Sequence, residues 1–106
     1  LTAAEQALLR RLSLFAGGWT LDAAEALCAG EGIEGWEVLD LLSSLVSKSM
    51  AETDAEGGRG TGLPRYRMLE TMRYYGMEQM SWPEKAATRD KHLDFFLQLL
   101  RAVLLD

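Results

Sequence analysis

The sequence contains one cysteine, one histidine and two prolines among its 106 residues. A single cysteine excludes an internal disulfide, and one cysteine with one histidine cannot complete a structural zinc site. No apolar run approaches the eighteen or so residues that a membrane-spanning helix needs, and no secretory signal opens the chain. We therefore expect a cytoplasmic protein that binds no metal and contacts no membrane. Because Leu1 stands where a methionine would begin a protein, we also expect a longer parent chain.

Basic residues are scarce too. Eleven Lys and Arg stand against sixteen Asp and Glu, so the formal net charge is −5. This charge argues against a domain that attracts nucleic acid through its overall field. The distribution is uneven, since residues 1–50 carry seven acidic and three basic residues, whereas four arginines lie within residues 59–73. A hydrophobic content of 48% is ordinary for one folded domain.

Hydrophobic spacing predicts five helices, near residues 4–16, 21–28, 36–48, 70–80 and 84–104. Between the third and fourth helices, residues 49–53 and 64–69 are predicted to pair as an antiparallel hairpin around a glycine-rich loop. The fold class is therefore mainly α with a small β-hairpin, a winged helix with an appended C-terminal helix. We place the winged-helix domain at residues 1–80, and a linker with one further helix at 81–106.

Local signals define several helix ends. Thr2 followed by Glu5 predicts a capping box, and Thr20 is expected to cap the second helix. Gly76 lies inside the fourth helix, where glycine costs about 1 kcal/mol relative to alanine, so we expect a close approach of another helix there.

The third helix would be the reading helix of a winged helix. Its apolar residues recur at three- and four-residue spacings and predict a wide buried face, comprising Val38, Leu39, Leu41, Leu42, Leu45 and Val46. Its predicted exposed face, a candidate contact surface, comprises Glu37, Asp40, Ser43, Ser44 and Ser47.

The last helix carries two apolar faces. One stripe is expected to press onto the domain and comprises Ala86, Leu93, Phe96, Leu97, Leu100 and Leu104. A second face would stay open and serve as a helical-repeat interface or a site of self-association; it comprises Phe95, Leu99 and Val103.

No catalytic or cofactor site emerges. Gly57 and Gly62 have the spacing of phosphate-loop glycines, but Leu63 and Pro64 stand where a lysine and a hydroxyl residue are required. His92 lacks any cue for an orienting acid, and Cys28 ends an apolar helix, as a small core residue does. We predict that this segment is not an enzyme and binds no cofactor.

DNA binding is the main competing hypothesis. The start of the third helix offers Glu34, Glu37 and Asp40, which phosphates would repel. A wing cluster could contact phosphate or a protein partner, or be an ordinary solvated face; it comprises Arg59, Arg65, Arg67 and Arg73. We favour contact with other domains of the same polypeptide over direct DNA contact, and both remain open.

Three segments carry a family resemblance: residues 9–21 (LRRLSLFAGGWTL), 41–49 (LLSSLVSKS) and 65–71 (RYRMLET). Together they resemble the winged-helix domain that follows the nucleotide-binding core in bacterial STAND-type ATPases, many of them transcriptional regulators. Residues 89–96 are similar to the start of the helical-repeat region that follows. The resemblance implies a non-catalytic relay between nucleotide state and a sensor array, with ATP or ADP in an upstream domain. A DNA-binding transcription-factor domain and a structural spacer are the alternatives.

Overall fold

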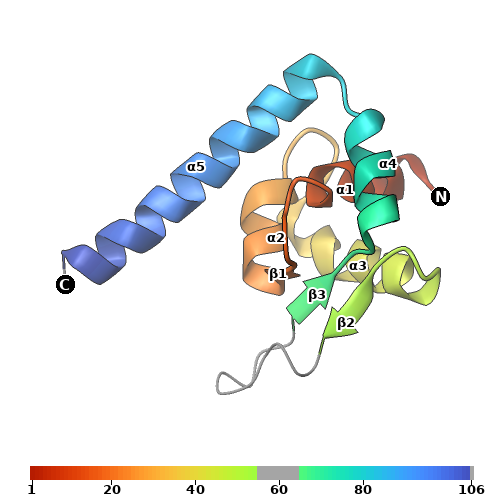
Figure 1. The fold of residues 1–106 in the computed structure, drawn as a ribbon, viewed down its shortest axis with the longest axis horizontal. Helices are drawn as coiled ribbons and strands as arrows, with labels where there is room; N and C mark the ends of the chain where they lie inside the picture. The colour runs from red at the N-terminus through yellow and green to blue at the C-terminus, as the bar shows by residue number, and fades with distance from the viewer. Residues whose placement is uncertain (55–64, 106) are drawn as a thin grey trace.

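The computed structural model describes residues 1–54 and 65–105. The helical elements are α1 (Ala3–Leu12), α2 (Leu21–Cys28), the 3-10 turn η1 (Gly35–Glu37), α3 (Val38–Ser47), α4 (Glu70–Glu78) and α5 (Trp82–Leu104). The strands are β1 (Trp19–Thr20), β2 (Glu52–Asp54) and β3 (Arg65–Arg67) (Figure 1). Within the described ranges, no helix is both long enough and apolar enough to cross a membrane.

The order of these elements is that of a winged helix, so the predicted fold class is confirmed. β2 pairs antiparallel with β3, with Thr53 opposite Tyr66, as the hairpin prediction requires. A third strand was not predicted, because β1 contains only two residues. It pairs with the other side of β3 and gives the sheet order β1-β3-β2. The predicted glycine-rich loop lies at residues 55–64, outside the described residues.

Capping explains where the first two helices begin. Thr2 Oγ1 accepts a hydrogen bond from Glu5 N at 3.1 Å, and Glu5 Oε1 accepts one from Thr2 N at 2.7 Å, which confirms the predicted capping box. Thr20 caps α2 by accepting from Ala23 N at 3.2 Å, again as predicted. However, α1 ends at Leu12 rather than near residue 16. The chain tightens there into turns that lead to Gly17, whose φ is +83°.

The core lies between the first three helices. Its fully buried side chains are Leu8, Leu12, Leu27, Cys28, Val38, Leu42 and Leu45. The predicted buried face of α3 is too wide, because Leu39 is 44% exposed. Val38, Leu42 and Leu45 are buried, whereas Leu41 and Val46 are only partly buried at the edge of the core.

Gly76 marks the predicted close approach of α4 to α1. A Cβ atom at this position would lie 2.8 Å from Ser13 Cβ and 3.3 Å from the Leu9 carbonyl oxygen. We predict that Gly76→Ala lowers the free energy of unfolding by about 1–2 kcal/mol, because the two helices must separate. In an open helix the same change would be stabilising by about 1 kcal/mol. Urea unfolding measures the sign, and a more stable variant would contradict the close approach.

Candidate functional site

η1 and α3 together present one outward stripe. Trp36, Asp40, Ser43 and Ser47 are all exposed and follow the i, i+4, i+7, i+11 spacing of one helix face. Leu39 borders this stripe. Three of the five predicted surface residues, Asp40, Ser43 and Ser47, therefore lie where the sequence places them.

Ser44 and Glu37 are only half exposed, and the prediction for Ser44 is wrong. The Ser44 hydroxyl donates a hydrogen bond to Glu5 Oε2 on α1. Its position between the outward stripe and the buried face brings it against α1 instead of solvent. Ser44 therefore links α3 to α1.

Glu5 also binds Lys48, the residue that follows α3. Lys48 Nζ lies 2.9 Å and 3.1 Å from the two oxygens of the Glu5 carboxylate, whose side chain is 4% exposed. Hydrogen bonds from Ser44, from the Thr2 backbone and from Lys48 hold the pKa of Glu5 well below its usual range. The positive charge of Lys48 is thus compensated within the domain.

The start of α3 is acidic and aromatic. Glu34 N donates to Glu37 Oε1 at 2.8 Å, so these residues close the first turn. Carboxylates stabilise this end of a helix but repel phosphate. Trp36 is 78% exposed and was not predicted as a site residue. Its spacing could have indicated that it shares a helix face with the exposed residues, because Trp36 precedes Asp40 by four residues and Ser43 by seven.

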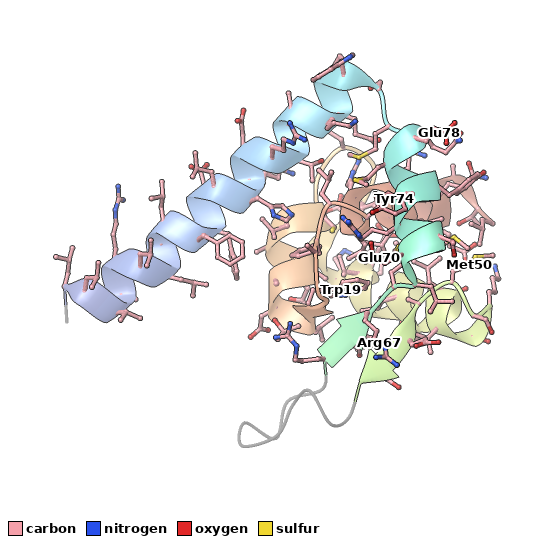
Figure 2. All side chains as sticks on the ribbon, viewed as in Figure 1. Trp19, Met50, Arg67, Glu70, Tyr74 and Glu78 are labelled. Atoms are coloured by element: carbon pink, nitrogen blue, oxygen red, sulfur yellow. The ribbon has the colours of Figure 1, made fainter. Side chains whose placement is uncertain are left out.

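Of the predicted arginine cluster, the described residues place only Arg65 and Arg67 on the hairpin. Arg67 on β3 pairs with Glu52 of β2 at 3.1 Å, and Arg65 is half-buried at the other end of the strand. Arg73 lies on α4, where it pairs with Glu70 at 3.3 Å and donates to the Ser13 carbonyl oxygen. Figure 2 shows Arg67 on the strand and Glu70 at the start of α4.

Arg73 is therefore wrongly assigned to the wing. The helix that begins at Glu70 carries it toward the end of α1. Arg59 lies outside the described residues. Within residues 1–54 and 65–105, the cations nearest to α3 and the sheet are mostly compensated by carboxylates, which lowers their value for binding phosphate.

His92 and Cys28 both pack against other side chains of the domain. The centroid of the His92 ring lies 4.5 Å from that of the Phe15 ring, with the rings tilted by 47°, and burial lowers the pKa of the imidazole. Cys28 is fully buried, and burial raises the pKa of its thiol to about 12, so it is a poor nucleophile. Residues 1–54 and 65–105 contain no cluster of three His, Cys, Asp or Glu side chains that could hold a metal ion.

α5 contacts the rest of the domain through an unexpected face. Thr88 is buried, and Lys91, His92 and Phe95 are half-buried against α2 and the turn before β1. Lys91 Nζ donates to the Ala29 carbonyl oxygen at 2.5 Å. This contact face contains polar residues, which explains why apolar spacing alone did not indicate it.

The stripe predicted to pack against the domain is therefore wrong, whereas the face predicted to stay open is open at two of its three positions. The stripe expected against the domain is exposed, with Leu93, Phe96, Leu97 and Leu100 all more than one-third accessible. Of the face expected to stay open, Phe95 packs against the core, Leu99 is 47% exposed and Val103 is 75% exposed.

Comparison with known proteins supports the architecture. The family model "Winged helix-turn-helix domain" matches residues 1–81. A protein named "Putative HTH-type transcriptional regulator" in Mycobacterium tuberculosis is 40% identical over 99 residues, covering 93% of this chain and 11% of the relative. A Mycobacterium bovis protein of the same description matches equally well.

A further relative is an uncharacterized protein of Mycobacterium tuberculosis, 37% identical over 107 residues, which cover 96% of this chain and 26% of that protein. The chain thus spans a minor part of each of these relatives. No solved structure matches it at a significant level. The fold and the family match agree, and the chain belongs to the winged helix-turn-helix domain family.

Proposed function

We propose that this domain is a non-catalytic module of a larger transcriptional regulator. The observation that carries the proposal is the exposed α3 beside a small antiparallel hairpin, the arrangement of a winged helix-turn-helix domain. The names of its Mycobacterium relatives support a role in transcription. The match covers only 11% of the length of the Mycobacterium tuberculosis relative, which supports a module within a longer protein.

Direct DNA contact is one candidate mechanism, and the family and the names of the relatives favour it. In such a complex α3 would enter the major groove, and Ser43 and Ser47 would face base edges or phosphates. Arg65 and Arg67 on β3 would lie at the hairpin that flanks the groove.

Contact with a protein surface is the second candidate, and the chemistry of α3 favours it. Trp36 and Leu39 form an exposed apolar centre, and Glu34 and Asp40 supply negative charge around it. Aromatic side chains are enriched at protein interfaces, and acidic groups complement a basic partner. Other domains of the same polypeptide would supply that partner, including the ATP- or ADP-binding domain that the resemblance implies. The relay of nucleotide state is part of this second candidate.

A titration against duplex DNA separates the two candidates. Because the exposed stripe of α3 carries no basic side chain among the described residues, we predict a Kd weaker than about 10 μM near 0.15 M salt, weakening further as salt rises. Fluorescence anisotropy with random and selected duplexes measures this. Thr71→Ala, an exposed change on α4, is the control for Ser43→Ala and Ser47→Ala. Tight binding that only the α3 variants abolish would establish direct DNA contact.

A further inference from the structure

α5 exposes a regular row of leucines. Leu93, Leu97, Leu100 and Leu104 are between 39% and 74% exposed. Their successive spacings of four, three and four residues are those of the core positions in paired helices. A 3.6-residue helical period places this leucine row on the side of α5 opposite Thr88 and Phe95, which contact the domain. The leucine row therefore faces away from the other elements of the described chain.

Figure 1 shows that the C-terminal half of α5 extends away from the body formed by the other elements. A second molecule can approach the leucine row there without meeting the rest of the domain. We propose that the leucine row binds a second copy of this chain, with the two α5 helices antiparallel. In this arrangement Leu97 packs against Leu100 of the second copy and Leu93 against its Leu104, which gives four layers of leucine.

Charge complementarity supports both the occupant and the orientation. Asp94 and Arg101 are exposed on the same flank of the leucine row, one helical repeat of seven residues apart. An antiparallel pair with these layers brings Asp94 close to Arg101 of the second copy, and the two-fold axis repeats the contact. In a parallel pair, Arg101 would instead lie beside Phe96 of the second copy, without an opposite charge.

The length of the row sets the expected affinity. The twelve residues from 93 to 104 make a contact about 18 Å long. A single helix pair of this length buries less surface than the interface of a standard stable complex. Four leucine layers without a further interface predict a weak dimer, with a Kd on the order of 10–100 μM.

Sedimentation of the whole 106-residue chain tests the proposal. Between about 5 and 500 μM, the weight-average mass is expected to rise from that of a monomer toward that of a dimer. Leu97→Glu with Leu100→Glu should keep the mass at the monomer value at all concentrations. Ala102→Glu, exposed on the opposite side of the same helix, is the matched control and should associate like the wild type. Circular dichroism confirms that each variant keeps its helices.

Charge reversal tests the orientation. Arg101→Asp should weaken association about tenfold at low salt, and Asp94→Arg combined with Arg101→Asp should restore it. A chain that stays monomeric up to about 500 μM would overturn the proposal and leave the row to a different occupant, such as a following helix of a longer protein. Association that persists in the double-glutamate variant would also overturn it, and an unaffected Arg101→Asp variant would overturn the antiparallel arrangement.

Discussion

Replacement of Arg11 by leucine is expected to lower the free energy of unfolding by about 2–4 kcal/mol. The Arg11 guanidinium is buried on α1 and donates to three carbonyl oxygens that follow α2, those of Cys28 at 2.7 Å, Gly30 at 2.7 Å and Glu31 at 3.0 Å. Leucine would fill part of the space but leave these carbonyls without their donor. Urea unfolding at neutral pH measures the loss.

Arg10→Leu is the matched control, because Arg10 is the neighbouring arginine on the same helix. Its side chain is 26% exposed and pairs with Glu84 of α5 at 2.7 Å. A partly exposed ion pair of this kind contributes at most about 1 kcal/mol, so the control should lose much less stability. Equal losses in the two variants would show that the three carbonyl contacts are not the source of the Arg11 effect.

The second large effect concerns Glu5 and acid stability. Glu5→Gln should lower the melting temperature by several degrees at pH 7, because Ser44 and Lys48 lose a buried carboxylate partner. Hydrogen bonds from Ser44, the Thr2 backbone and Lys48 lower the folded-state pKa of Glu5 from its usual 4.5, so its contribution is complete above that pH and is lost progressively as the pH falls from there toward the lowered pKa. The melting temperatures of the wild type and the variant should therefore converge in acid.

Thermal unfolding followed from pH 7 to pH 3 tests this convergence. Glu25→Gln, an exposed change on α2, controls for the general effect of removing one negative charge. A difference between wild type and Glu5→Gln that stays constant across this range would contradict a stabilising role for the ionised carboxylate. At neutral pH the same variant should also free Lys48, which gives the DNA titration a more basic form of α3.

Elements with local signals could be predicted from the sequence. α2 has the predicted bounds of residues 21–28, because Thr20 caps its start and a glycine-containing segment follows its end. The hairpin was predicted within about three residues of its observed position, because its strands flank a glycine-rich segment. The exposed serines of α3 followed from its helical period.

Features that depend on distant partners could not be predicted. The sequence gives no sign that Arg11 is buried, because its acceptors lie at a turn where Gly30, Glu31 and Gly32 adopt positive φ. That turn brings the carbonyls together only in the folded chain. Likewise, periodicity revealed two apolar faces on α5, and the stripe that we expected against the domain is the exposed one. His92 and Lys91, both polar, contribute to the face that packs against the domain instead.

The one-sided attachment of α5 has a mechanical consequence. The helix is held near its first turns by Glu84, and near its middle by Lys91 and Phe95, whereas its last turns touch nothing else in the described chain. With 23 residues, α5 is about 34 Å long. A tilt of about 10° beyond Phe95, the last attached residue, moves the end of the free part, residues 96–104 and about 14 Å long, by about 2 Å. A small rearrangement around Lys91 and Phe95 would thus displace whatever packs on the tip of α5.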